Sequence, residues 1–238
     1  MNFIPARFVF ALSVSTALIA GLAPLPLHAA GMLPETSVVI VNESDGEASI
    51  NVKNTDAKPA LMFTSLTGIP GDDDTLLIVT PPVARVEPGE TQLVRFLLQT
   101  KEPLKTQRLR RVIFEGIPPK NTEPGLRVTM NVRQNLPVLI HPKGLAKDDQ
   151  PWKRLKWSVG TGTLRVVNDS PYVVRLATAV QLLPSTATVE LPRPHVLPGE
   201  TVEVPLPAAA KGAATVRLVP ATVYGFTVAS YDVRLAAH

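Results

Sequence analysis

The sequence predicts an all-β protein built from two β-sandwich domains in series, and three observations support this fold class. Short runs of β-favouring residues recur along the chain, with turn-forming residues between them. Helical periodicity is hard to find after the first 30 residues. Proline accounts for 24 of 238 residues, about double its average share of roughly 5%. Because proline cannot donate to a sheet ladder, this abundance indicates many short strands with interrupted edges.

The first 30 residues have the layout of a secretory signal peptide. Arg7 supplies a positive start, Phe8 to Leu22 is an uncharged apolar run, and small residues follow up to Ala29 and Ala30, where we expect cleavage. A membrane anchor is the alternative, but the apolar run is shorter than the roughly 20 residues that a membrane span needs. We therefore expect an exported, soluble mature chain with no membrane insertion.

Charge and cysteine content exclude several classes of function. The formal net charge is +4, and because Arg7 is the only charged residue of the first 30, the mature chain would carry +3. A charge this small does not suggest nucleic-acid binding, although the basic balance would help electrostatic contact with a partner. Cysteine is absent, which excludes disulfides, a catalytic thiol and a thiolate metal site.

The first half of the mature chain contains seven strand-like runs, the inventory of an immunoglobulin-like sandwich of about 100 residues. Three adjacent aspartates, Asp72 to Asp74, lie in the turn between the third and fourth runs. A solvated turn is the prediction and a calcium site the alternative, since calcium takes six or more oxygens from spaced positions. The seven runs are Thr36–Val41, Ala48–Val52, Ala60–Leu66, Thr75–Val79, Thr91–Leu98, Leu109–Phe114 and Leu126–Ile140.

The seventh run alternates strictly at its start. Val128, Met130 and Val132 point one way, whereas the residues between them are polar. Side chains of a strand project to opposite faces with a period of two, so this stretch has one apolar and one polar face. Two interpretations stay open on pattern alone: the apolar row lies in the core of its own sandwich, or it is left open for another chain.

A second set of strand-like runs follows a polar connection. We predict an N-terminal domain over residues 31–142, a linker over 143–151 that is polar and contains proline and glycine, and a C-terminal domain over 152–238. The second set has the same number of runs as the first, which indicates two similar sandwiches. They are Leu155–Val159, Thr163–Val167, Tyr172–Leu182, Ala187–Leu191, Thr201–Pro205, Ala214–Leu218 and Thr222–Leu235.

Three motifs resemble those of a known family. The sequence T-P-P-V-A-R-V-E-P-G spans Thr80 to Gly89, and F-E-G-I-P-P spans Phe114 to Pro119 and leads into the alternating seventh run. In the second half, N-D-S-P-Y occupies Asn168 to Tyr172. Their order and spacing resemble the periplasmic pilus (fimbrial) chaperones of the chaperone–usher pathway, and the resemblance covers essentially the whole mature chain.

This resemblance implies two immunoglobulin-like domains set at an angle, with a role in the periplasm. Such chaperones bind pilus or fimbrial subunits, keep them folded and unpolymerised, and deliver them to an outer-membrane usher. Each subunit lacks one strand, and the chaperone lends its own seventh strand to fill the gap, which is strand addition to a sheet edge. Aligned on the I-P-P turn and on Pro142, the lent row falls on Val128, Met130 and Val132.

The sequence departs from the family pattern at the expected anchor for the subunit's C-terminal carboxylate. The family uses an arginine on the first strand and a lysine on the seventh, but Ser37 and Pro137 occupy these positions. Arg133, on the same strand face as Pro137, is the substitute that we predict, because arginine binds carboxylates with two hydrogen bonds. A solvated arginine is the alternative. A second basic group, Arg108 with its neighbours at 110 and 111, is predicted to be solvated edge charge.

Other classes of function fit the sequence less well. No nucleophile turn and no histidine pair with metal-ligand spacing is visible, so we expect no enzyme activity, metal or cofactor. His195 lies in a proline-rich connection and is predicted to be a surface residue. A secreted structural or adhesive β-sandwich protein, or a chaperone for another exported β protein, is the alternative function. Pro81 and Pro82 are left open as cis or trans.

Overall fold

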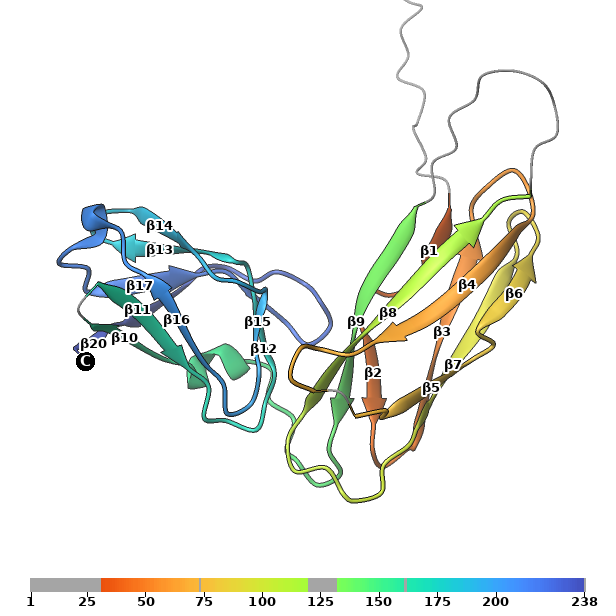
Figure 1. Ribbon diagram of the computed structural model, residues 1–238, viewed down its shortest axis with the longest axis horizontal. Coiled ribbons are helices and arrows are strands. Elements are labelled where there is room, and N and C mark those ends of the chain that lie inside the picture. The colour runs from red at the N-terminus through yellow and green to blue at the C-terminus, as the bar shows by residue number, and fades with distance from the viewer. Residues whose placement is uncertain (1–30, 73, 120–131, 161, 238) are drawn as a thin grey trace, which may run out of the picture.

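Two β-sandwiches set at an angle make up the protein in the computed structural model, which describes residues 31–72, 74–119, 132–160 and 162–237. Figure 1 shows the N-terminal sandwich on the right, with its strands roughly upright, and the C-terminal sandwich to its left. The predicted fold class, two immunoglobulin-like domains in series, is confirmed.

The N-terminal sandwich contains two sheets, and the first segment of the described chain contributes one strand to each of them. One sheet has the order β1-β3-β7-β5 and the other the order β2-β9-β8-β4-β6. The short strand β1 therefore pairs in one sheet, and the next strand, β2, pairs in the other. The strands are β1 (Met32–Pro34), β2 (Val39–Asn42), β3 (Glu47–Asn54), β4 (Ala60–Thr67), β5 (Leu77–Thr80), β6 (Val83–Val86), β7 (Thr91–Leu98), β8 (Arg108–Ile117) and β9 (Arg133–His141).

Alternating apolar residues of both sheets form the core of this domain. Along β8, every second residue from Val112 to Gly116 is buried, as the period of two requires. Phe96 of β7 and Phe114 of β8 are fully buried and supply the largest side chains. Leu136, Val138 and Ile140 of β9 belong to the same core, so the end of β9 is anchored in its own sandwich.

The C-terminal sandwich follows a short 3₁₀ helix, η1 (Pro151–Arg154), and contains three small sheets. Their orders are β16-β11-β10-β20, β15-β12-β18 and β14-β13-β17-β19. The strands are β10 (Lys156–Gly160), β11 (Thr163–Val167), β12 (Val174–Leu176), β13 (Ala179–Leu183), β14 (Ala187–Glu190), β15 (His195–Val196), β16 (Thr201–Pro205), β17 (Thr215–Leu218), β18 (Pro220–Ala221), β19 (Tyr231–Arg234) and β20 (Ala236–Ala237), and a second 3₁₀ helix, η2, spans Ala208–Ala210.

The same asparagine-centred corner occurs in both domains. Asn54 is fully buried, and its side-chain amide donates to the Val86 carbonyl at 2.9 Å, while Asn168, also fully buried, donates likewise to the Val196 carbonyl at 3.0 Å. The main-chain carbonyl of each asparagine accepts a hydrogen bond from the amide of a turn glycine with positive φ. This glycine is Gly89 in the N-terminal domain and Gly199 in the C-terminal domain. The Pro-Gly turns of the two domains are therefore equivalent, and the N-D-S-P-Y motif has a structural role.

An apolar contact joins the two domains. Leu109 and Leu139 lie on the outer face of the five-stranded sheet and pack with Ile69 against Val173 of the C-terminal domain. Gln107 is buried beside this contact, and its side-chain oxygen accepts from the Val173 amide at 2.9 Å. The sheet that contains β8 and β9 therefore turns its outer face toward the C-terminal domain.

Several predicted strands differ from the structure. Val83–Val86 of the T-P-P-V motif forms a strand, β6, that the sequence did not suggest, and the Thr80–Pro81 peptide bond is cis. The run predicted over 172–182 is divided into β12 and β13, and most of the run predicted over 222–235 is a connection that precedes β19. Local pattern identified most of the strands, but it does not show where a neighbouring strand stops pairing. The beginning of the seventh run, 126–131, lies outside the described residues.

Candidate partner-binding surface

The beginning of β9 has one unpaired edge among the described strands. Antiparallel β8 pairs with β9 from Arg133 to Ile140, whereas parallel β2 pairs only with the last part, from Val138 to His141. Residues 133–137 are thus bonded on one side and open on the other. An open edge offers free N–H and C=O groups to an incoming strand.

The side chains of β9 that face the core, Leu136, Val138 and Ile140, form a row. This row continues toward Val132, past the buried part of the sandwich. Leu136 is 8% exposed, whereas Val132, four residues earlier on the same face, is 36% exposed. Val132 lies beside Gly31, since a Cβ built on Gly31 would stand 3.5 Å from the Val132 Cβ. Val128 and Met130 would continue the row by the same alternation, but both lie outside the described residues. The row therefore leaves its own core near Val132.

Two of the three residues considered for the carboxylate anchor, Pro137 and Arg133, belong to β9, and the third, Ser37, precedes β2. Pro137 is buried and is paired in register with Arg111 of β8. Ser37 is exposed, and its hydroxyl donates to the Tyr224 carbonyl of the C-terminal domain at 3.3 Å. Arg133 pairs with Glu115 at 2.8 Å, and 67% of its side chain is exposed. Arg133 is therefore accessible, but a carboxylate already shares its charge.

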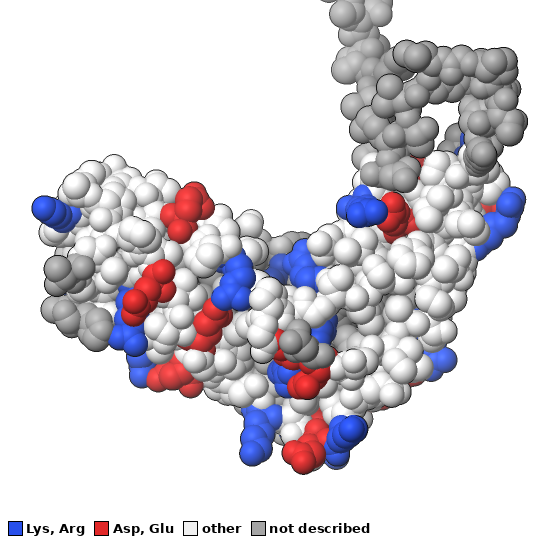
Figure 2. Space-filling model, in the orientation of Figure 1, with Lys and Arg blue, Asp and Glu red and all other residues white. Residues whose placement is uncertain are grey.

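Basic side chains from both domains gather in the hollow between them, and Figure 2 shows Lys and Arg on both of its sides. Arg111 follows Leu109 by two residues on one face of β8, and Arg175 follows Val173 by two residues in the other domain. Because Leu109 and Val173 belong to one cluster, both arginines come to the same region. His195 pairs in register with Arg175. The prediction of a surface His195 is wrong, because the ring is half-buried.

The pKa values of His195 and Arg175 are both lowered in this basic cluster. Burial and, after it, the charges of Arg193, Arg111 and Arg175 together lower the pKa of His195 to about 4. The pKa of Arg175 is also lowered, first by burial and then by the charge of Arg111. The sequence does not reveal this cluster, because Arg175 and His195 lie in no local motif. The alternation of Leu109 and Arg111 on β8 was the available signal.

The prediction for the other basic residues of β8 is also wrong in part. Arg110 is 4% exposed, and its guanidinium donates two hydrogen bonds of 2.7 Å to Asp72. Arg108 also binds Asp72 and donates to Asp74 at 2.9 Å. The aspartate turn, predicted to be solvated, therefore closes over β8 through Asp72. No group of three or more His, Asp or Glu side chains that could hold a metal ion is found in the described ranges.

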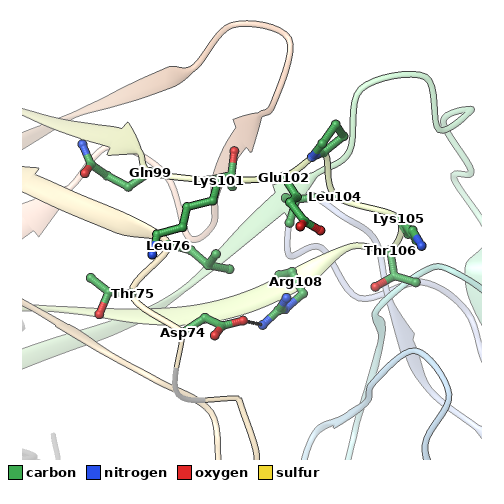
Figure 3. Close-up of a pocket in the computed structure, with 12 residues that line it drawn as sticks. Asp74, Thr75, Leu76, Gln99, Lys101, Glu102, Leu104, Lys105, Thr106 and Arg108 are labelled. Atoms are coloured by element: carbon green, nitrogen blue, oxygen red, sulfur yellow. Dashed lines mark hydrogen bonds and ion pairs between the residues drawn. The ribbon is translucent and has the colours of Figure 1, made fainter.

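A surface cavity of about 640 Å³ lies next to this ion-pair network. Figure 3 shows Arg108 and Asp74 on one side of it and the segment from Gln99 to Thr106 on the other. Lys101 and Lys105 are exposed around this open cavity. Most of the residues that line it are polar or charged, so it has the character of a solvated hollow beside a connection.

A group of exposed apolar side chains covers another part of the five-stranded sheet. Leu61 is paired in register with Ile117, and Phe63 with Val83. All four are 40–50% exposed, at 47%, 43%, 40% and 50% respectively. We refer to these four residues as the apolar patch. Exposed apolar groups of this kind mark interaction surfaces more often than scattered single residues do.

Comparison with known proteins identifies the family. Residues 31–146 match the family described as the pili and flagellar-assembly chaperone, PapD N-terminal domain, and residues 150–230 match the pili assembly chaperone PapD, C-terminal domain. The chain belongs to the PapD family of pilus-assembly chaperones. It is similar to the uncharacterized fimbrial chaperone YhcA of Escherichia coli K12, with 44% identity over 83% of this chain and 88% of the relative. It is also 30% identical to the chaperone protein FimB/FhaD of Bordetella pertussis, over 69% of this chain and 72% of that protein.

Solved structures of other chaperones share the fold. The Escherichia coli chaperone DraB has a TM-score of 0.70 and 21% identity, over 87% of this chain and 98% of that chain. A chain from the complex of the Salmonella enterica SafA pilin with the SafB chaperone has a TM-score of 0.72 and 19% identity, over the same shares. The part of this chaperone that the structure describes contains no helix with the length and hydrophobicity of a membrane span.

Proposed function

We propose that this PapD-family chaperone binds fimbrial subunits by lending them the row Val128, Met130 and Val132. The observation that carries the proposal is the course of β9, whose core-facing row runs out of its own sandwich beside an open strand edge. A subunit that lacks a strand presents the complementary defect, an open groove over its core. The main chain of the lent strand would bond the groove's edges, and the alternate side chains would fill its pockets.

The energetics of this proposal come from apolar burial. Each of the three side chains would contribute roughly 1.5–3 kcal/mol when buried in the subunit. The cost of ordering the segment and of association reduces the net gain. Met130 is flexible and polarisable, which suits pockets that differ from one subunit to the next. The polar side chains between them, among them Thr129 and Asn131, would face away from the groove.

The names of similar proteins support a fimbrial subunit as the partner. The proteins YhcA and FimB/FhaD are named a fimbrial chaperone and a chaperone protein, and SafB is a chaperone in complex with a pilin. We propose the same class of partner here, with action by binding and without a catalytic step. We further propose that residues 1–30 are removed as a signal peptide, that the chaperone acts in the periplasm, and that residues 143–151 link its domains.

The outer-membrane usher is the second partner that we propose. The apolar patch supports a docking surface separate from the lent row, since it lies on β4, β6 and the end of β8. A loaded chaperone that used its β9 edge for the subunit would retain this patch for the usher. For the carboxylate anchor, Arg133 stays a candidate, although its pairing with Glu115 makes it a weaker one than an unpaired cation.

Exchange of one side chain on each strand face tests the proposal. Met130→Arg places a charge in the apolar row and should abolish recovery of the fimbrial subunits of the same organism when they are co-expressed with the tagged chaperone. Thr129→Arg, the matched control, adds the same charge on the opposite face and should recover subunits as the parent does. Mass spectrometry would identify the captured proteins. Equal recovery by the parent and both variants would remove the row from the binding role.

A further inference from the structure

His141, the last residue of β9, uses both of its ring nitrogens at the junction of the two domains. Nδ1 lies 2.9 Å from the side-chain nitrogen of Gln107, and Nε2 lies 2.9 Å from the Leu145 carbonyl oxygen. The side-chain oxygen of Gln107 in turn accepts from the Val173 amide of the C-terminal domain. The ring is half-buried and Gln107 is 3% exposed. His141 therefore belongs to a hydrogen-bonded series that runs from Val173 to Leu145.

The two ends of this series fix the direction of every hydrogen bond in it. The main-chain amide of Val173 can only donate, so Gln107 presents its side-chain oxygen to Val173 and its NH₂ group to His141. Nδ1 of His141 must then accept, whereas Nε2 must carry the proton that the Leu145 carbonyl accepts. The neutral imidazole with its proton on Nε2 satisfies this arrangement.

The segment that His141 holds is also bonded to the C-terminal domain. Leu145 lies in residues 143–151, which we propose as the linker, and the carbonyl of the next residue, Ala146, accepts from the Tyr172 hydroxyl at 2.8 Å. Two routes thus lead from His141 to the C-terminal domain, one through Gln107 and one through the linker. A change of charge at His141 would act on both routes.

A second proton on His141 does not fit this arrangement. The imidazolium donates from both nitrogens, so Nδ1–H would point at the NH₂ group of Gln107. A turn of the Gln107 amide would satisfy His141, but it would place the NH₂ group against the Val173 amide. A turn of the ring away from Gln107 would instead release the Leu145 carbonyl. Because unmatched buried donors are costly, each outcome weakens one of the two routes between the domains.

Other titratable groups face His141 from several elements. Arg108, next to Gln107 on the chain, is paired with Asp72, and Asp148 is paired with Arg154. Side chains of these types ordinarily titrate outside the range from pH 5 to 8, whereas histidine titrates within it. Protonation of His141 is therefore the change that mild acid brings to the junction. The groups that line a cavity of about 200 Å³ with His141, or bond to its main chain, are Lys147, Asp148, Asp149, Tyr224 and Glu43.

We infer that His141 is a pH switch at the domain junction: the neutral ring holds the two domains at a fixed angle, and its protonation releases them. The angle should therefore be well defined at pH 7.5 and should vary widely at pH 5. The switch itself does not depend on the proposed function, whereas its effect on a bound subunit does. Strand β9 ends at His141, so its open edge would lie beside a C-terminal domain without a fixed position, and subunit binding should weaken in acid.

Energy transfer between two dyes measures the switch in the free chaperone. Because the chain contains no cysteine, Lys53→Cys and Thr188→Cys place one dye at an exposed position of each domain. The distribution of transfer efficiencies among single molecules should be narrow at pH 7.5 and about twofold broader at pH 5, after histidine has changed its charge. A distribution that does not change between these pH values overturns the switch.

Two variants assign the response to His141. In His141→Asn, the side-chain oxygen can accept from Gln107 near the position of Nδ1 without taking up a proton, so the distribution should be the same at both pH values. Gln107→Ala removes the bridge and should give a broad distribution at both. The control His195→Gln removes a second half-buried histidine and should respond like the parent. A response of His141→Asn as large as that of the parent, or a narrow distribution for Gln107→Ala at pH 7.5, overturns the switch. Circular dichroism verifies that each variant is folded.

Capture of a co-expressed subunit tests the effect on binding. The parent should release the subunit at least tenfold faster at pH 5 than at pH 7.5, and His141→Asn should show a smaller increase. Equal increases in the parent and in His141→Asn would overturn the effect of the switch on binding. Failure of the parent to bind any subunit at pH 7.5 would instead refute the proposed function, and the dye measurement on the free chaperone would still decide the switch.

Discussion

Asp72 is the residue on which two arginines of β8 converge. Arg110 is buried and places both Nη atoms on the Asp72 carboxylate, while Arg108 binds it from a more exposed position. Burial by itself raises the pKa of Asp72, but the hydrogen bonds and charges of Arg110 and Arg108 outweigh burial and hold the pKa well below its ordinary range. Asp72 therefore stays ionised and compensates a buried charge.

Loss of the Asp72 charge should destabilise the N-terminal domain strongly. Asp72→Asn leaves Arg110 buried without a counter-charge, which costs about 3–5 kcal/mol for pairs of this kind. Asp232→Asn, which breaks the exposed pair with Arg217, is the control and should cost at most about 1 kcal/mol. Urea unfolding at pH 7 gives both values. Equal small losses in the two variants would contradict a structural role for Asp72.

The same variant predicts a pH dependence with a defined sign. A carboxyl group whose folded pKa is depressed stabilises the fold fully above its unfolded pKa of about 4, and this contribution is lost as the pH falls toward the folded pKa. The difference in free energy of unfolding between the parent and Asp72→Asn should therefore be constant above about pH 5 and shrink below about pH 4.

Single residues were the least predictable from the sequence. Asp72 lies 36 and 38 positions before its two arginine partners, so nothing local distinguishes it from a solvated turn aspartate. Lone polar residues usually do lie on the surface, and the predictions for Arg110 and His195 followed that rule. Both failed because a residue distant in sequence lies beside the side chain, Asp72 for Arg110 and Arg175 for His195.

Strand β9 illustrates what pattern can predict at the scale of one element. The alternation of Val128, Met130 and Val132, just before β9, predicted two faces, since a period of two is a local property of the chain. It left open whether this row serves its own core or a partner. In the structure Val132 is exposed, whereas Leu136, four residues later, is buried. The division depends on where β2 and the facing sheet end, which the sequence of β9 does not contain.

Replacing single side chains of this face by alanine should lower the free energy of unfolding by different amounts inside and outside the core. Leu136→Ala removes a core side chain and should lower the free energy of unfolding by about 2–5 kcal/mol. Val132→Ala, on the same face but beyond the core, should change it by no more than about 0.5 kcal/mol. Urea denaturation of the free chaperone compares the two. A large loss for Val132→Ala would mean that the row is still part of the domain's own core there.

At the scale of the whole molecule, a small set of contacts fixes the two domains relative to each other. Gln107 links them twice: its main-chain amide donates to the Pro171 carbonyl, and its side-chain oxygen accepts from the Val173 amide. The resemblance implied two domains set at an angle, which the structure confirms, but the motifs do not show which contacts fix that angle. The contact residues Leu109 and Leu139 read as ordinary strand residues in the sequence.

Removal of the Gln107 side chain should widen the range of angles between the two domains without unfolding either of them. Gln107→Ala leaves the Val173 amide without its acceptor and should broaden the distance distribution measured by small-angle X-ray scattering, while near-UV circular dichroism stays unchanged. Gln181→Ala, which truncates an exposed glutamine of β13, is the control and should leave the scattering unaltered. An unchanged scattering profile for Gln107→Ala would show that the other contacts between the domains hold the angle without this side chain.

The absence of cysteine allows a direct test of the central claim, that the row at 128, 130 and 132 enters the partner's core. Single cysteines placed at each position from 128 to 132 are labelled with a maleimide in the free chaperone and in its complex with a subunit. The account predicts protection with a period of two: strong at 128, 130 and 132, and weak at 129 and 131. Uniform labelling along all five positions in the complex, or protection of the odd positions instead, would contradict strand lending by this row.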